Sequence, residues 1–339
     1  HSYYRLSDGK QPGEMFPGEY KFFFGGSVKP QFTRVLTIGQ DPISLNFALV
    51  TLKSSTGKGL AGGVVSYYAG GWVSSAAVTD ETGTAVLALP GGKSATAVAI
   101  DYKGGRVQLN QRMSENPVFS FTTVPVSVKL ISSTGNALSG AVSHYGTATG
   151  GWLRFGDNGE GAANTSMEML EQAYTFQMNY KGALQNQKVT VSGATEVTFT
   201  TRAFTFKLLD SAGAPLSGTA NFYAGKWQPF GDNGEGETNA AMELLPVEHT
   251  FEVIHNGARQ QRKINVADAS EALFQTGRVT IRFASGKLTF YTTKWFTYTE
   301  PVELLPVEIK FYFEGGGFPK KTQPITPVAG QSLEYTIAY

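Results

Sequence analysis

The chain has 339 residues, of which 41% are hydrophobic and 16% charged, and its formal net charge is +1. This composition suits several folded domains and differs from that of disordered chains. Scattered Lys and Arg form no basic run for nucleic acid, and no apolar run of about 18 residues exists for membrane insertion. Cysteine is absent, which excludes disulfides, thiolate metal sites and a cysteine nucleophile.

Internal repeats organise the sequence. The segment STGKGLAG at residues 55–62 returns as STGNALSG at 133–140 and as SAGAPLSG at 211–218. Each copy precedes an aromatic segment that ends in tryptophan, and ELLPVE occurs at both 243–248 and 303–308. Such repetition indicates a fold built from copies of one supersecondary unit.

These repeats divide the chain into four units and a partial one. We predict a partial unit at 1–46, followed by unit 1 (47–123), unit 2 (124–201), unit 3 (202–277) and a shorter unit 4 (278–339). Residues 1–46 match only the second half of a unit. Because the chain also begins at His1 rather than Met, we expect either a fragment cut within a repeat or a sandwich completed by strands of another chain, which would allow self-association.

Alternating apolar and polar residues predict β-strands throughout, as at 126–130 and 204–208. One apolar face per strand is typical of a sheet with one buried side. About seven strands per unit, separated by Gly, Asn or Pro, predict an all-β fold of small sandwiches in tandem. Adjacent units join without a Gly/Ser-rich or Pro-rich spacer, so we expect a stiff, elongated rod.

The stretch NTSMEMLEQAY at 164–174 contains good helix formers. Its Glu171 nevertheless aligns with Pro246 and Pro306 of the sister units. Proline inside a helix removes a hydrogen bond and clashes with the preceding turn. We therefore predict strand–turn–strand for this stretch.

The acidic, glycine-rich motif GDNGEG occurs at 156–161 and again at 231–236. A twelve-residue calcium loop needs oxygen ligands at alternate positions, but Gly159 and Gly161 occupy two of them when the count starts at Asp157. Asn-Gly between strands is typical of a two-residue hairpin turn. We interpret the motif as a turn that recurs with the fold. The alternative interpretation is a weak cation site of another geometry.

Three segments carry a family resemblance: TDETGTAVLALPGGK at 79–93, SAGAPLSG at 211–218 and ELLPVEHTFEV at 243–253. They resemble the immunoglobulin-like and prealbumin-like repeats of bacterial surface proteins, with CnaB-type and carboxypeptidase-regulatory-like domains nearest. The resemblance extends over essentially the whole chain. It implies an exported protein at the cell surface, whose sandwiches form stalks or adhesive fibres.

Many CnaB-type domains carry an isopeptide bond between a lysine of the first strand and an asparagine of the last. The first strands here supply Lys53, Lys129 and Lys207, but the last strands supply neither Asn nor Asp. By alternation these lysines also point away from the core. We expect solvated lysines and no such bond.

The usual catalytic motifs for nucleophile elbows, phosphate loops, dinucleotides and zinc are absent from the sequence. His144, His249 and His255 stand at strand positions where sister units have Tyr or Phe, so packing or hairpin-end contact is expected, with a metal ligand as the less favoured reading. We expect no catalytic residue, no metal and no cofactor, and predict that the protein is not an enzyme.

Tyrosine and tryptophan recur on one strand face of every unit. A tyrosine ends the polar face of one strand, and after a short loop a tryptophan opens the next strand, which makes the two rings cross-strand neighbours. The pair either pins the hairpin or forms an exposed platform for a sugar ring or a partner protein. The candidate residues are Tyr68, Trp72, Tyr145, Trp152, Tyr223, Trp227, Tyr291 and Trp295.

These observations together predict a non-enzymatic, extracellular structural or adhesive repeat protein, a stalk, fibre or adhesin segment of a microbial cell surface. The alternatives are a carbohydrate-binding array that uses the Tyr–Trp pairs, or an accessory region of a large secreted enzyme. Expected partners are a cell-surface glycan or protein, or neighbouring copies of the same chain. Nucleic acid and membrane insertion are not expected.

Overall fold

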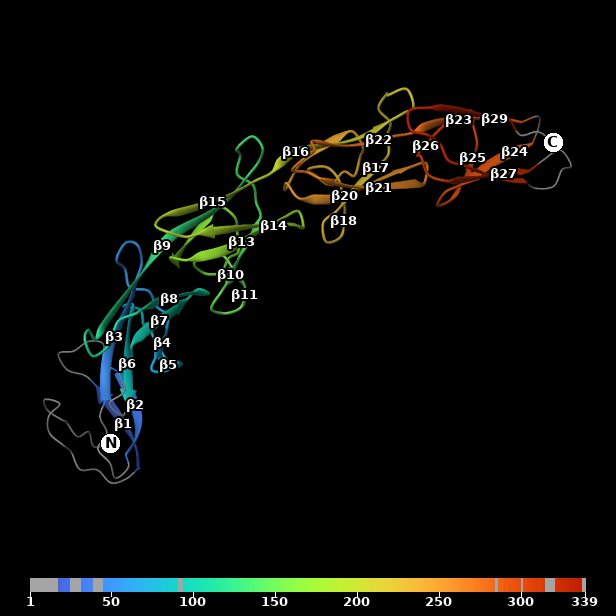
Figure 1. Ribbon diagram of the computed structural model, residues 1–339. Coiled ribbons are helices and arrows are strands. Elements are labelled where there is room, and N and C mark those ends of the chain that lie inside the picture. Colours follow the sequence, from blue (N-terminus) through green and yellow to red (C-terminus); the bar gives the residue numbers. More distant parts are fainter. Residues whose placement is uncertain are drawn as a thin grey trace.

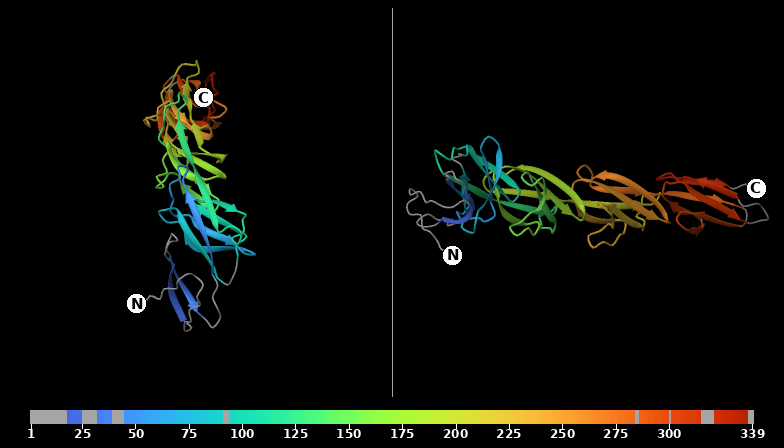
Figure 2. Two further views of the ribbon diagram at one scale, coloured as in Figure 1. Left: turned by 90° about the vertical axis from the view of Figure 1, so that its left-hand side faces the viewer. Right: turned by 90° about the horizontal axis from the view of Figure 1, so that it is seen from below.

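The chain forms an elongated, gently bent row of small β-sheet bodies in a computed structural model that describes residues 18–24, 32–38, 45–90, 94–283, 286–299, 301–314 and 321–336 (Figure 1). Regular structure in these ranges is strand, and no helix occurs among them. The perpendicular views show the same row, with unit 1 toward one end and unit 4 at the other (Figure 2). The predicted tandem array of β-sandwiches is confirmed. The described residues include no helix that is long and apolar enough to span a membrane.

A two-stranded hairpin precedes unit 1. Strands β1 (Gly18–Phe24) and β2 (Phe32–Ile38) pair antiparallel, with Gly18 opposite Ile38. The remainder of 1–44 lies outside the described residues, so completion of the partial unit by another chain stays a prediction.

Every full unit contains a four-stranded antiparallel sheet. In units 1 and 2 its strands are β4 (Val64–Tyr68), β5 (Trp72–Val78), β7 (Ala97–Tyr102), β8 (Gly105–Leu109), β10 (Ala141–Gly146), β11 (Gly151–Arg154), β13 (Ala173–Tyr180) and β14 (Ala183–Thr190). In units 3 and 4 they are β17 (Thr219–Tyr223), β18 (Trp227–Pro229), β20 (Glu248–His255), β21 (Ala258–Asn265), β24 (Lys287–Tyr291), β25 (Trp295–Thr297), β27 (Ile309–Glu314) and β28 (Lys321–Ile325). The strand orders are β5-β4-β7-β8, β11-β10-β13-β14, β18-β17-β20-β21 and β25-β24-β27-β28.

A second, mixed sheet faces the first across each core. Its strands are β3 (Leu45–Lys53), β6 (Thr84–Pro90), β9 (Val118–Ile131), β12 (Thr165–Leu170), β15 (Thr195–Thr200), β16 (Arg202–Leu209), β19 (Ala240–Leu244), β22 (Glu271–Gln275), β23 (Gly277–Arg282), β26 (Val302–Leu304) and β29 (Ser332–Thr336). The first strand of a unit lies in the centre, antiparallel to the fourth strand and parallel to the seventh, as in the order β19-β16-β22. All four units thus contain the seven strands expected.

The parallel pairing of first and last strands explains the elongated shape. Two parallel strands start at the same end of a sandwich, so the chain leaves each unit at the end opposite to the one where it entered. Strand β9 then runs unbroken from unit 1 into unit 2. Only Thr201 separates β15 from β16, and only Thr276 separates β22 from β23. We retain the sequence-derived units as proposed domain limits, joined without a spacer.

Phenylalanines fill the cores between the sheets. In unit 3, Phe204 stacks on Phe251 with ring centroids 4.7 Å apart, and Phe206 stacks on Phe274 at 5.2 Å. The cores are not confined to single units. Leu170 of unit 2 packs into the buried cluster of unit 1, and the buried side chains of units 2–4 form one connected cluster.

Two predictions about individual segments are confirmed. Residues 164–174 contain all of β12, a turn and the start of β13, so this stretch is strand–turn–strand. Lys129 and Lys207 lie on the outer face of the mixed sheet, where they form ion pairs of 2.6 Å with Glu196 and 2.5 Å with Glu271 on the neighbouring parallel strand. Lys53 is exposed on the same face of unit 1.

Candidate functional site

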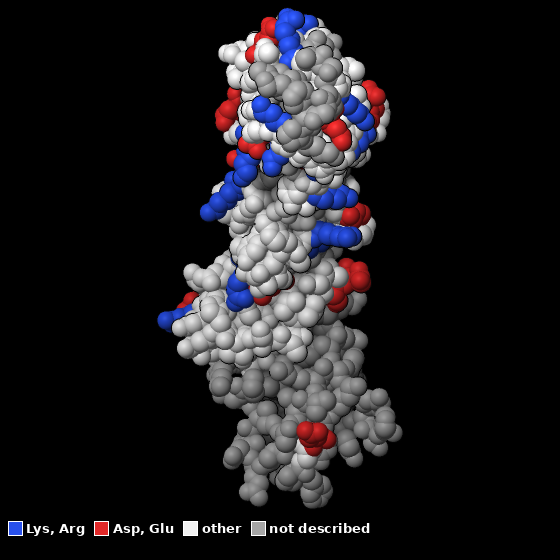
Figure 3. Space-filling model, turned by 90° about the vertical axis from the view of Figure 1, so that its right-hand side faces the viewer, with Lys and Arg blue, Asp and Glu red and all other residues white. Residues whose placement is uncertain are grey.

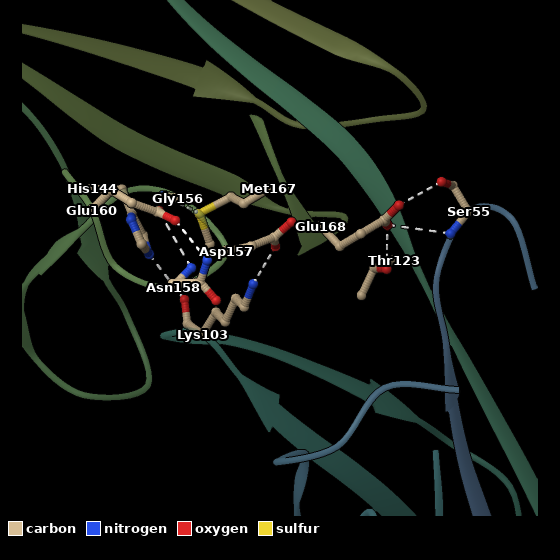
Figure 4. Close-up of polar contacts among 10 residues, drawn as sticks. All are labelled: Ser55, Lys103, Thr123, His144, Gly156, Asp157, Asn158, Glu160, Met167 and Glu168. Carbon is tan, nitrogen blue, oxygen red and sulfur yellow. Dashed lines mark hydrogen bonds and ion pairs between the residues drawn. The ribbon is translucent and has the colours of Figure 1, made fainter. Parts of the chain in front are cut away.

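A glutamate of each following unit reaches back across the joint to the unit before it. At the first joint, between units 1 and 2, Glu168 of β12 accepts hydrogen bonds from the Ser55 amide (3.2 Å) and the Ser55 hydroxyl (2.5 Å). The same carboxylate accepts a hydrogen bond of 2.5 Å from Thr123, which is almost fully buried within β9. Figure 4 shows Glu168 pointing from its strand toward both partners. We call this three-residue arrangement the glutamate clasp.

The clasp is repeated at the second joint, between units 2 and 3, and at the third, between units 3 and 4. Glu243 contacts Ser133 and Thr201, and Glu303 contacts Ser211 and Thr276. In every copy the serine lies in the turn after the first strand, and the threonine lies at the end of the preceding unit, within β9 or directly before β16 or β23. Three donors around one carboxylate favour a single side-chain geometry, because hydrogen bonds to charged groups are the stronger ones.

Unit 1 lacks the clasp glutamate. Glu168 lies opposite Pro125 and Glu243 opposite Ala203 in the strand register, and the equivalent pair in unit 1 is Ala88 opposite Phe47. The alanine side chain offers no acceptor at this position. The clasp therefore belongs to the three joints between full units.

The second contact at each joint is a hairpin turn of the preceding unit, and it docks on the opposite sheet. At the first joint this turn is Lys103-Gly104, where both residues have positive φ (45° and 78°). Gly104 lies against unit 2 so closely that an added Cβ would be 2.7 Å from Leu153 Cδ1 and 2.8 Å from Gly146 Cα. The Lys103 carbonyl contacts His144 Nε2 at 2.9 Å, and the Gly104 carbonyl accepts from the amide of Ala148 at 3.0 Å.

Equivalent turns occupy the other two joints. The Lys181 carbonyl accepts a 2.9 Å hydrogen bond from Gln228 of unit 3, and the Asn256 carbonyl accepts one of 3.0 Å from Thr292 of unit 4. A Cβ on Gly182 would lie 2.5 Å from the Ala224 carbonyl oxygen. Each joint is thus held at two points, one on each sheet of the sandwich.

The recurrence of GDNGEG has its explanation here. Asp157, the second residue of the motif, forms an ion pair of 2.6 Å with Lys103 of the preceding unit (Figure 4). Asp232 forms the equivalent ion pair of 3.1 Å with Lys181. At the third joint the turn carries Asn256 in place of lysine, and unit 4 has no GDNGEG. The GDNGEG motif therefore occurs in the two units whose preceding unit has a lysine in its docked hairpin turn.

The predicted hairpin geometry of GDNGEG is wrong. The loop connects β11 to β12, which belong to different sheets, and positive φ occurs at Gly156, Gly159 and Gly161 but not at the asparagine. The Gly159 amide donates to the Gly156 carbonyl at 3.1 Å, which makes a turn inside a crossover loop. The hairpin prediction failed because the sequence does not show which sheet each flanking strand joins.

Hydrogen bonds within the loop hold its second carboxylate. Glu160 accepts a bond of 2.8 Å from the Asn158 side chain, and its pKa is lowered by hydrogen bonds from its own amide and from Asn158. Gly156 has a φ of +113°, a backbone conformation that residues with a side chain rarely adopt, so glycine is favoured there. No group of three or more His, Cys, Asp or Glu side chains that could hold a metal is found in the described part of the chain.

The three strand histidines make packing and backbone contacts. His144 and His249 are buried, and burial lowers the pKa of both. His249 Nε2 lies 3.2 Å from the Leu245 carbonyl, and His255 Nδ1 lies 3.0 Å from the Ser217 carbonyl. The expectation of packing and hairpin-end contact is confirmed, and for His144 the contact crosses a joint.

All four predicted Tyr–Trp pairs are direct cross-strand neighbours. The centroid distances are 5.7 Å for Tyr68–Trp72, 5.6 Å for Tyr145–Trp152, 5.5 Å for Tyr223–Trp227 and 5.2 Å for Tyr291–Trp295. Each of the eight residues remains 38–56% exposed. Three of the hairpins, β4–β5, β10–β11 and β17–β18, lie along the lower, concave side of the bent row (Figure 1). The pairs thus pin their hairpins and also present aromatic surface.

The sequence interpretation missed the clasp residues. The recurrent serine after each first strand and the glutamate of ELLPVE were both visible in the repeats. Both residues recur at equivalent positions of successive units, and this recurrence was the signal that could have identified them. Glu243 and Glu248, which would need to share a cleft to act as an acid pair, are separated: Glu243 lies in the clasp, and Glu248 lies 3.5 Å from Lys263 on the surface.

Surface charges are mixed. Lys and Arg alternate with Asp and Glu over the described residues of the face in Figure 3, without a large area of one sign. Positive and negative side chains placed singly are typical of a solvated surface. This face offers no extended site for a polyanion.

No protein-family model matches the chain, and a search of curated proteins finds no match. Among solved structures, the Bacillus anthracis TIE protein is 12% identical with a TM-score of 0.20, covering 97% of this chain and 75% of that chain. A streptococcal ancillary pilin is 10% identical with a TM-score of 0.20 (64% and 95%), and BcpA, the major pilin subunit of Bacillus cereus, is 11% identical with a TM-score of 0.18 (87% and 99%). Scores and identities this low carry no inference about fold or function, and they do not assign the chain to a family.

Proposed function

We propose that this chain is a non-enzymatic stalk or fibre segment of a microbial cell surface, which holds an adhesive or structural element away from the cell. The observation that supports the proposal is the repeated two-point joint, with a glutamate clasp on the mixed sheet and a docked hairpin turn on the four-stranded sheet. Two contacts on opposite faces oppose bending in the plane that contains both of them. A single contact would leave a hinge.

The parallel arrangement of the first and last strands in each unit supports the same function. Because the first and last strands of each unit run parallel, tension applied at the two ends of the array acts along the strands. Unfolding a unit under such a load requires its parallel pair to slide, which breaks several backbone hydrogen bonds together. In β16 and β22 the paired residues extend from Thr205–Glu271 to Leu209–Gln275.

Small-angle X-ray scattering of the whole chain tests this proposal. We expect an elongated particle whose pair-distance distribution does not change with protein concentration. The triple variant Glu168→Ala/Glu243→Ala/Glu303→Ala removes the three clasps, and we expect it to show a smaller radius of gyration and a Kratky plot of a flexible chain. The control Glu237→Ala alters an exposed glutamate outside the joints. If the wild type were as flexible as the triple variant, the stalk function would be refuted.

A further inference from the structure

An open pocket of about 390 Å³ lies at the second joint. Unit 3 contributes nine of its ten lining residues, among them Lys226, Trp227 and Asp232, and Lys181 of unit 2 completes the lining at the joint. The bond from Gln228 Nε2 to the Lys181 carbonyl closes the joint beside it. Ligand sites occur preferentially at such boundaries between domains.

The indole of Trp227 is the one large aromatic surface of this pocket that faces solvent. Trp227 as a whole residue is 41% exposed, and its ring meets that of Tyr223 edge-on, at an interplanar angle of 70°. Edge contact with tyrosine uses part of the ring and leaves a flat apolar area open. The tyrosine also keeps the indole in position, since the two residues are paired across β17 and β18.

Polar groups surround the indole on one side. Asp232 places one carboxylate oxygen on Lys181 at 3.1 Å, and its second oxygen remains able to accept from a ligand hydroxyl. Lys226 is exposed and has no ion-pair partner among the described residues. The pocket therefore combines a flat apolar surface with one acceptor and one donor at its edge.

The charges near the pocket balance. Lys181 and Lys226 contribute two positive charges, while Asp232 and the neighbouring Glu235 contribute two negative ones, and Lys181 is among the groups that lower the pKa of Glu235. A phosphate or sulfate ester would be favoured by an excess of positive charge, and the pocket has none. A buried peptide anchor would need an enclosed apolar pocket, whereas this one is open.

We propose that this pocket binds a neutral pyranose residue of a glycan, stacked with its C–H face on Trp227. A pyranose has a flat apolar face and a rim of hydroxyls that donate and accept, which matches an exposed indole flanked by Asp232 and Lys226. The proposal does not depend on the stalk function, because a flexible array would still contain the docked pocket in part of its population. It also distinguishes the Tyr223–Trp227 pair from the Tyr291–Trp295 pair, whose unit has no GDNGEG loop.

Binding of the whole chain to a glycan array tests the proposal. We expect signal on neutral hexose or N-acetylhexosamine chains, and an apparent Kd at least about tenfold weaker for Trp227→Ala, which corresponds to about 1.4 kcal/mol. Trp295→Ala is the matched control, because Tyr291 and Trp295 form a similar pair in a unit that has no GDNGEG loop. We expect the control to keep wild-type affinity.

A second measurement covers the case in which Trp227→Ala disturbs the fold. The chain has four tryptophans, so its indole N–H signals are few and can be assigned by single Trp→Phe variants. Titration with the best neutral glycan should shift the Trp227 signal and leave that of Trp295 unchanged. Absence of any glycan signal, equal loss in both variants, binding restricted to carboxylated or sulfated glycans, or an unmoved Trp227 signal would each overturn the proposal.

Discussion

Removal of one clasp should loosen one joint without unfolding its units. Glu243→Ala takes away the acceptor of the Ser133 amide (3.1 Å), of the Ser133 hydroxyl (2.5 Å) and of the Thr201 hydroxyl. The Thr201 hydroxyl keeps a contact of 3.3 Å to the Ile131 carbonyl, so it is not left without a partner. The loss is therefore confined to contacts between units 2 and 3.

The magnitude follows from the three bonds. We assign about 1 kcal/mol to each hydroxyl bond and about 0.5 kcal/mol to the amide bond, which water partly replaces after the substitution. The docked state of the joint should lose about 2–3 kcal/mol in total. This raises the ratio of undocked to docked molecules roughly 30- to 150-fold.

Spin-label distance measurements report this change directly. The chain has no cysteine, so two introduced cysteines can be labelled specifically. Exposed positions in the neighbouring units are Thr190 of β14 and Lys263 of β21. We expect one narrow distance distribution in the wild type and a broadened one in Glu243→Ala.

The control for Glu243→Ala is a second glutamate of the same unit. Glu237→Ala removes an exposed carboxylate of unit 3 that has no role in the clasp, and its distance distribution should match the wild type. If Glu243→Ala left the distribution as narrow as before, the clasp would contribute nothing to the stiffness of the joint. The turn contact alone would then account for it.

Three further predictions concern the turn contact. Gly182→Ala should lower the melting temperature and broaden the second joint, because its φ of +83° disfavours a side chain and the added Cβ would clash with unit 3. Gly193→Ala has the same kind of backbone strain at φ of +64° but its Cβ would meet open space, so it should lower the melting temperature and leave the joint unchanged. Burial lowers the pKa of His144, so the unfolded chain binds this proton more readily; its effect on stability is absent above about pH 7 and becomes unfavourable as the pH falls below the ordinary value of about 6.5. His144→Phe should remove that part of the acid sensitivity seen in thermal melts between pH 7 and 5, and an unchanged pH profile would contradict it. Asp157→Asn breaks an exposed ion pair with Lys103 and should cost less than about 1 kcal/mol at low salt; a cost that persisted in 1 M NaCl would show that the pair does not act through its charge.

Local patterns predicted much of the fold and the aromatic pairs. Period-2 alternation identifies strands because successive side chains point to opposite faces, and the Tyr223–Trp227 pair follows from a short hairpin whose register is set by its loop. Pro246 and Pro306 also excluded a helix in the aligned stretch at 164–174, because a proline inside a helix removes a hydrogen bond and clashes with the preceding turn. These predictions needed no knowledge of how units meet.

The prediction about GDNGEG shows where such reasoning stops. Asn-Gly is typical of a hairpin, yet the strand that follows the loop pairs with the mixed sheet instead of folding back on its neighbour. Choice of sheet depends on pairing with β9, whose residues lie far away in the chain. The ion pair from Asp157 to Lys103 depends in turn on how two sandwiches dock.

The sequence by itself thus determined the repeats, their strands, the lack of spacers and the exposed aromatic pairs, since all of these arise from neighbours along the chain. Only the tertiary structure decided how the units are fastened to one another. Glu168 and Ser55 are 113 positions apart, and nothing in their local sequence brings them together. They meet because the first and last strands of a sandwich run parallel, which places the end of one unit against the beginning of the next.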